Sequence, residues 1–127
     1  MATPQILEYG IAPDAKEAQG KFLQLRLAGT EYLLFAPKQL HGFHGQILAQ
    51  FLKERALAHH WENEQTLKVD AAGVMVIGGG KFRLDAAACL LELGDNSQAF
   101  GRFDDRGIAD RIKSAGHRWS GFDIRID

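Results

Sequence analysis

The sequence predicts an α/β (α+β) fold, with a single mixed, largely antiparallel sheet of about six strands and two packed helices. Several short segments alternate apolar and polar residues, as half-buried strands do. Two other segments repeat apolar residues at intervals of three and four, which is typical of helices that bury one face. The two kinds of segment come in mixed order along the chain, which favours helices packed on a sheet.

The first half of the chain contains a predicted hairpin and the longer predicted helix. The expected elements, in order, are a short strand at 5–9, a polar loop at 13–20, strands at 22–27 and 32–35, and a helix from about His41 or Phe43 to about His60. The two longer strands form a hairpin because Gly29-Thr30 separates them. In the helix, the apolar residues that fall on one stripe are Ile47, Leu48, Phe51 and Leu52.

The second half of the chain is richer in predicted strands. We expect strands at 66–70, 74–77, 81–84, 89–93 and 122–126, a turn at 71–73, a loop at 95–101, and a second helix at 104–115. Asp104 or Asp105 is suited to cap this helix, because an aspartate at its start can accept free backbone N–H groups. Ile108 and Ile112 lie one turn apart on its apolar face.

Length and composition exclude several classes of protein. At 127 residues and a net charge of −1, the chain is expected to form one domain, 1–127, without a field that attracts nucleic acid. The single cysteine, Cys89, excludes an internal disulfide, and its apolar neighbours predict a buried, inert thiol. No apolar stretch is long enough to cross a bilayer, and the residues after Met1 lack the basic start of a secretory signal. We therefore expect a cytoplasmic monomer with no membrane or nucleic-acid partner.

The segment VMVIGGGKFRLD, residues 74–85, places three glycines and a lysine inside an alternating pattern. A P-loop would need glycine at Met75 and serine or threonine at Phe82, and a strand follows where that motif has a helix. A dinucleotide fingerprint is excluded for the same reason. Two interpretations are left. The glycines form a bulge or bend that lets a helix pack closely, or they lie beside an anion that Lys81 helps to bind.

His44 lies where the first predicted helix begins. Free backbone N–H groups and the helix dipole favour an anion there and disfavour the cationic form of a histidine. A neutral His44 is a candidate general base, although its position alone favours a plain polar residue at a helix start. A metal site with His41 is not expected, because His59 and His60 fall about 20 Å further along the predicted helix. The loop at 95–101 offers a second set of backbone amides, with the hydroxyl of Ser97 beside them.

Three short motifs in order resemble the Janus/Ocnus family, whose best-known members are the protein histidine phosphatases. The resembling segments are Phe43-His-Gly-Gln-Ile47, Ile77-Gly-Gly-Gly-Lys-Phe82 and Ser97-Gln-Ala-Phe-Gly101. The resemblance implies that His44 is the catalytic residue. It also implies a set of phosphate-binding residues, namely Lys21, Gly45, Lys81, Ser97, Gln98 and Ala99. The chain departs from the family pattern in having Ala36 in place of an arginine, Phe43 in place of tyrosine and Asn96 in place of an aromatic residue.

The activity that the resemblance implies is the metal-free hydrolysis of a phosphoramidate, with no cofactor. The substrate would be phosphohistidine, or phospholysine, in a protein or a small molecule. His44 would act as general base on a water molecule or attack the phosphorus atom itself. Two alternatives stay open: a non-catalytic module of the same fold that binds a phosphorylated protein, and a small structural domain without a phosphate site.

Overall fold

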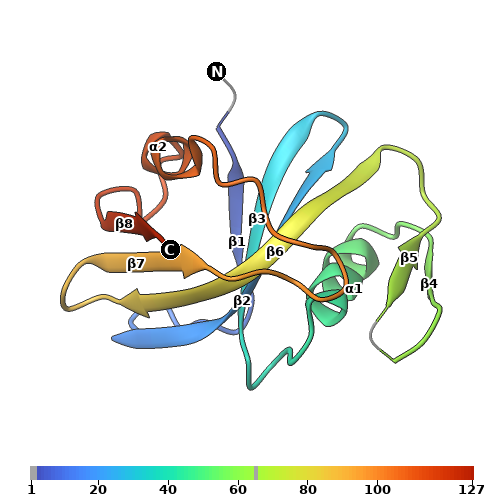
Figure 1. Cartoon of the computed structure of the whole chain (residues 1–127), viewed down its shortest axis with the longest axis horizontal. Coiled ribbons are helices and arrows are strands. Elements are labelled where there is room, and N and C mark those ends of the chain that lie inside the picture. The colour runs from blue at the N-terminus through green and yellow to red at the C-terminus, as the bar shows by residue number, and fades with distance from the viewer. Residues whose placement is uncertain (1–2, 65) are drawn as a thin grey trace.

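The fold is built around one mixed sheet, as seen in a computed structural model that describes residues 3–64 and 66–127. Figure 1 shows the elements in chain order. They are β1 (Gln5–Glu8), β2 (Glu17–Leu27), β3 (Thr30–Pro37), α1 (His44–Glu54), β4 (His59–Trp61), β5 (Leu67–Val69), β6 (Val74–Asp85), β7 (Leu90–Gly94), α2 (Ile108–Ser114) and β8 (Asp123–Ile126).

The main sheet has the strand order β1-β3-β2-β6-β7-β8. The outer pairs, β1 with β3 and β7 with β8, are parallel, and the three inner pairs are antiparallel. This confirms the predicted α+β class, the six-stranded mixed sheet and the hairpin of β2 and β3. The small second sheet of β4 and β5 was not predicted: β5 pairs with the segment after α1 and not with β6.

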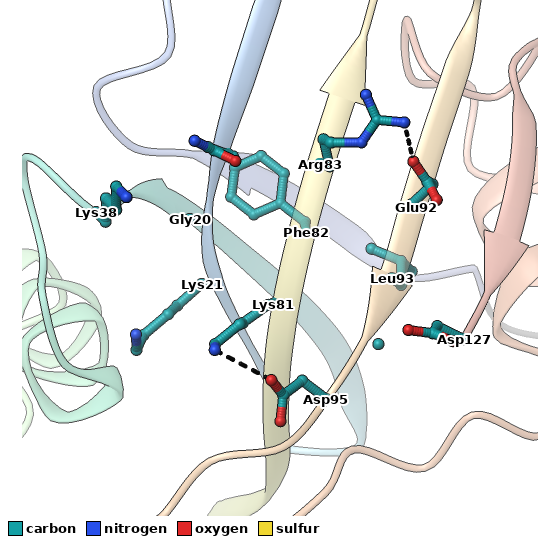
Figure 2. Close-up of a pocket in the computed structure, with 12 residues that line it drawn as sticks. Gly20, Lys21, Lys38, Lys81, Phe82, Arg83, Glu92, Leu93, Asp95 and Asp127 are labelled. Carbon is teal, nitrogen blue, oxygen red and sulfur yellow. Dashed lines mark hydrogen bonds and ion pairs between the residues drawn. The ribbon is translucent and has the colours of Figure 1, made fainter.

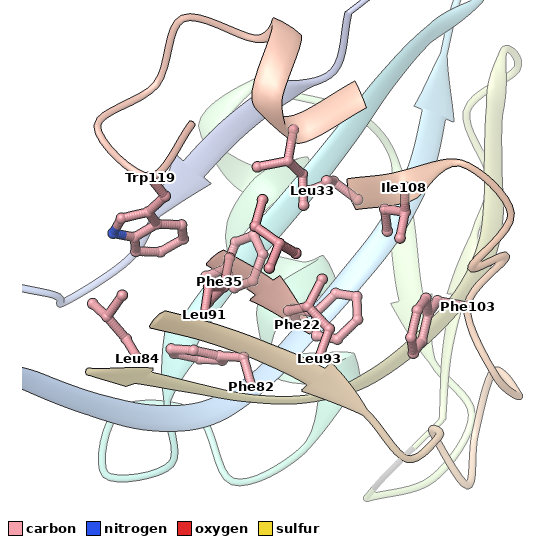
Figure 3. Close-up of a cluster of buried hydrophobic side chains, with 12 residues drawn as sticks. Phe22, Leu33, Phe35, Phe82, Leu84, Leu91, Leu93, Phe103, Ile108 and Trp119 are labelled. Atoms are coloured by element: carbon pink, nitrogen blue, oxygen red, sulfur yellow. The ribbon is translucent and has the colours of Figure 1, made fainter. Parts of the chain in front are cut away.

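Each face of the main sheet carries its own hydrophobic core, because side chains alternate between the faces along every strand. On one face the predicted stripe of α1, Ile47, Leu48, Phe51 and Leu52, packs on Leu23 and Leu34. On the other face α2 and the segment before β8 cover a cluster of aromatic rings, which Figure 3 shows around Phe22, Phe35, Phe82 and Trp119. The two helices therefore lie on opposite faces of the sheet.

The two central strands are longer than predicted. Residues 17–20, expected in a loop, extend β2 and pair with 82–85 of β6. β6 also runs without a break through the three glycines, where two separate strands were expected. The register shifts between Gln24 and Leu25, beside Gly78, so a bulge accompanies the glycines without interrupting the strand.

The predicted end of the first helix and the predicted start of the second were wrong. α1 stops at Glu54, and the chain turns at Ala56, whose φ is +53°, a left-handed position usually taken by glycine. His59 and His60 lie in β4, so their expected place on the helix was also wrong. α2 begins at Ile108 after Gly107, and neither Asp104 nor Asp105 caps it. Asp104 instead pairs with Arg106, and its backbone N–H donates to Gln24.

The prediction of a buried thiol was also wrong. Cys89 is exposed and has a φ of +49°. It is the last residue of the turn between β6 and β7, whereas the sequence predicted it as the first residue of a strand. Among residues 3–64 and 66–127, no helix has the length and apolar character needed to span a bilayer.

Candidate functional site

A cavity of about 340 Å³ lies between the start of α1, the middle of the sheet and the loop after β7. Six of the residues singled out from the sequence line it: Lys21, His44, Lys81, Ser97, Gln98 and Ala99. Gly45, the seventh, is buried next to His44 and does not line the cavity. The remaining lining residues are Gly42, Phe43, Asp95 and Asn96. Segments that are far apart in the sequence thus meet at one cavity.

The first turn of α1 presents free backbone N–H groups at this cavity. Phe43 is the N-cap residue, with extended backbone angles, and its N–H donates to the side chain of Gln46 at 3.1 Å. Phenylalanine has no side-chain acceptor to return a bond, so this capping arrangement is only half formed. In the described part of the chain, the N–H groups of His44 and Gly45 meet no acceptor. An anion at the helix start would satisfy them.

The imidazole of His44 is buried, with 4% of the residue exposed. Its Nε2 lies 2.9 Å from the carbonyl oxygen of Gly80. Because a carbonyl only accepts, Nε2 must carry the proton, and the neutral ring has its lone pair on Nδ1. A side chain on Gly79 would lie 2.5 Å from Cδ2 and 2.7 Å from Nε2. The Cδ2–Nε2 edge therefore faces β6, and the opposite edge, which carries Nδ1, faces away from the strand.

The surroundings of His44 keep it neutral. Burial is the main cause that lowers its pKa below 6.5, and the ammonium group of Lys21 lowers it further. The carbonyl groups of Gly80 and Phe22 and the carboxylate of Asp95 oppose this effect. The unprotonated form therefore predominates at neutral pH, as a general base requires.

Each of the three glycines of β6 leaves room for a different neighbouring group that a side chain would strike. An added Cβ on Gly78 would lie 2.3 Å from the carbonyl oxygen of Arg102, and one on Gly80 would lie 2.3 Å from that of Gly94. On Gly79 it would strike the ring of His44. The segment after the loop also pairs with β6, since Gly79 N–H donates to Gly101 and Gly79 accepts from Phe103. The glycines thus let α1 and the loop reach the same point of the sheet from two directions.

The loop at 97–101 is a tight turn closed by two backbone hydrogen bonds between Ser97 and Gly101. The N–H of Ser97 donates to Gly101, so it is not free for a ligand. The hydroxyl oxygen of Ser97 accepts the N–H of Phe100 at 3.1 Å, which makes the buried serine mainly a brace for the turn. By contrast, the N–H groups of Gln98 and Ala99 have no acceptor among the described residues. These two amides are the ones available at the cavity.

Two lysines face each other at the cavity, because Lys21 of β2 and Lys81 of β6 are directly paired in register. Like charges at opposed positions repel. Lys81 Nζ lies 3.1 Å from Asp95, and this ammonium group is the main cause that holds the pKa of Asp95 below its usual range. Lys21 has no carboxylate partner within the described ranges. A bound anion would offset the repulsion between the two lysines.

A second cavity, of about 500 Å³, adjoins the first and shares Lys21, Lys81 and Asp95 with it. Figure 2 shows that Lys38 stands near Lys21 on one side of this cavity, while Arg83 and Glu92 form an ion pair on the other. The lining of this cavity is mixed in charge, with Asp127 also present.

Sequence reasoning missed Asp95 as a part of the site. Its φ of +63° lets the chain leave β7 sharply and brings its carboxylate to Lys81. The only sequence signal was its place after Gly94, at the end of an apolar strand, where aspartate tolerates the left-handed conformation.

No protein family model matches the chain, and no curated protein matches it. Within the described ranges, no three or more His, Cys, Asp or Glu side chains gather as a metal site would require.

Proposed function

We propose that this chain is a phosphoramidate hydrolase that removes the phosphoryl group from phosphohistidine without a metal ion. One observation supports it above the others: a neutral, buried histidine, the free backbone amides of three lining residues and two lysines surround a single cavity, and the free amide of Gly45 is next to them in the chain. The resemblance of the three motifs to the protein histidine phosphatases agrees with this reading. Phospholysine is the alternative substrate of the same chemistry.

The amides would hold the phosphoryl oxygens. Those of His44 and Gly45 approach from the helix start, and those of Gln98 and Ala99 approach from the loop. Lys21 and Lys81 would offset the charge that spreads over the oxygens in the transition state. Both binding groups are fixed by the fold before a ligand arrives, because the turn at 97–101 and the start of α1 are held by internal hydrogen bonds.

His44 Nδ1 would accept a proton from a water molecule. As the water oxygen forms a bond to phosphorus, the P–N bond breaks and its electron pair stays on the leaving nitrogen. That nitrogen takes up the proton that His44 returns, so that the water is divided between inorganic phosphate and the free imidazole of histidine, or the free amine of lysine in the case of phospholysine. Attack by Nδ1 itself, followed by hydrolysis of a phosphorylated enzyme, uses the same groups.

The test is phosphate release from a phosphohistidine peptide in the presence of EDTA. We expect His44→Ala to lower the rate by about 10²–10⁴-fold, the usual contribution of a general base. His60→Ala is the matched control, because His60 is an exposed histidine of β4 that pairs with Asp70. Equal rates in the wild type and His44→Ala would contradict the proposal.

The burial of His44 favours a second candidate, a module that binds a phosphorylated protein without turning it over. Only 4% of His44 is exposed, which leaves little of the ring open to water. Saturable binding of a non-hydrolysable phosphohistidine analogue, with no phosphate release by the wild type from the phosphohistidine peptide, would establish this alternative. In that case His44→Ala would weaken binding of the analogue.

A further inference from the structure

Phe43 has no evident structural role. It is the N-cap residue of α1, a position where Ser, Thr, Asp or Asn supplies an acceptor to the first turn. Phenylalanine supplies none. Its side chain is not part of either core, and 43% of the residue is exposed. A large apolar side chain that neither caps the helix nor packs in a core is suited to contact a ligand.

Phe43 lines the same cavity as His44. Among the described residues that form this cavity, it is the one large apolar side chain. The others are charged or polar, or are the small residues Gly42 and Ala99. The ring therefore stands at the rim of an otherwise polar site, one residue before the proposed base.

An aromatic ring gives the oxygens of a phosphoryl group neither a hydrogen-bond donor nor a positive charge. Those oxygens require donors and cations, which the amides, Lys21 and Lys81 provide. The ring is instead suited to contact the group to which the phosphoryl group is attached. In phosphohistidine that is a planar aromatic imidazole, whereas in phospholysine it is a flexible aliphatic chain. Two aromatic rings in contact gain stability beyond the area that they bury.

We infer that Phe43 is a specificity-determining residue, which packs against the imidazole leaving group and selects phosphohistidine over phospholysine. This inference rests on the proposed hydrolase function. Phe43 also lacks a hydroxyl, so it offers the phosphoryl oxygens no competing donor. It acts on the leaving group and takes no part in the proton transfer.

The test compares kcat/KM for three substrates: a phosphohistidine peptide, a phospholysine peptide of the same sequence, and phosphoramidate, which has no carbon on its nitrogen. In Phe43→Leu, we expect the ratio of phosphohistidine to phosphoramidate turnover to fall about three- to tenfold, the range of an aromatic pair. The ratio of kcat/KM for the phosphohistidine peptide to that for the phospholysine peptide should fall by a similar factor in this variant. Phe43→Trp keeps an aromatic face and should retain both ratios.

Phe43→Ser separates this role from a structural one. Serine is a good N-cap residue, so the melting temperature should rise while the phosphohistidine preference falls. Unchanged ratios of kcat/KM in Phe43→Leu would overturn the inference, whether or not the three values fall together. A wild type that hydrolyses phosphoramidate without preferring phosphohistidine would refute this inference alone. A wild type inactive on all three would refute the proposed function and this inference with it.

Discussion

The protonation of His44 depends on charged groups on both sides of the cavity. Lys21 lowers its pKa and Asp95 raises it, while burial remains the largest cause of its low value. The position of His44 at the start of a helix could be predicted from the sequence. The balance of charges around it could not, because Lys21 lies on β2 and Asp95 follows β7, and only the fold brings them together.

The pH dependence of activity should follow from this balance. Since the pKa of His44 is below 6.5, kcat/KM should be level near pH 7 and fall as the pH drops through that lowered pKa. Lys21→Met should move this acid limb to higher pH, because the cation that disfavours protonation is lost. Asp95→Asn should move it to lower pH, because an anion that favours protonation is lost.

The measurement is the pH profile of kcat/KM for each variant, read for the position of the limb and not for its height. Both residues line the proposed phosphate site, so both variants should also be slower. Limbs that move in the same direction, or do not move, would show that His44 is not the titrating group.

At the scale of single elements, β6 owes its shape to its glycines. Glycine weakens an ordinary strand, which is why the sequence predicted a break there. The strand survives because Gly78 and Gly80 admit backbone carbonyl groups and Gly79 admits a histidine ring. These contacts come from segments distant in sequence, so the pattern of residues 74–85 could suggest an unusual backbone but not its continuity.

Gly79→Ala should therefore displace His44. The new Cβ would lie 2.5 Å from Cδ2 of the ring and 2.8 Å from the carbonyl oxygen of Phe22. We expect at least a tenfold loss of kcat/KM, since a base displaced by about 1 Å loses much of its effect. Overpacking should also lower the free energy of unfolding by about 1–3 kcal/mol. Gly121→Ala is the control, because nothing lies within 4 Å of its Cβ.

The imidazole ¹⁵N shifts of His44 report the cause directly. In the wild type they should show a proton on Nε2, as the bond to Gly80 requires. In Gly79→Ala that pattern should change, while Gly121→Ala keeps it. A folded Gly79→Ala with wild-type activity and the same shifts would contradict the packing argument.

The ends of the helices show what local patterns leave out. The apolar stripe of α1 was predicted correctly because 3.6-residue periodicity is a property of the segment itself. Its end was not, because Ala56 takes a left-handed conformation without the usual glycine. For α2, the two aspartates suggested a cap, but the backbone N–H of Asp104 donates to Gln24 and its carboxylate accepts from Arg106. Boundaries thus depended on tertiary contacts, whereas the fold class and most of the candidate site followed from sequence.

At the scale of the whole molecule, a buried polar network ties the loop before α2 to the centre of the sheet. Gln24 accepts the N–H of Asp104 at 2.7 Å and donates to Glu31 at 2.7 Å. Arg111 of α2 reaches the same carboxylate through two hydrogen bonds, at 2.8 and 3.1 Å. The network therefore joins β2, β3, α2 and the segment that follows the proposed phosphate-binding turn.

Arg111→Met should destabilise the whole fold, because it leaves the carboxylate of Glu31, which is 5% exposed, without its cation. Breaking a buried ion pair in this way costs about 3–5 kcal/mol, and Gln24, which still donates to Glu31, should hold the loss near the lower value. Urea unfolding measures it. Arg106→Met is the matched control, since the exposed pair of Arg106 with Asp104 should add little to stability. The double variant Glu31→Leu/Arg111→Met should recover part of the loss, because an apolar pair leaves no buried charge unpaired. If Arg111→Met is no less stable than Arg106→Met, the network does not hold α2 to the sheet.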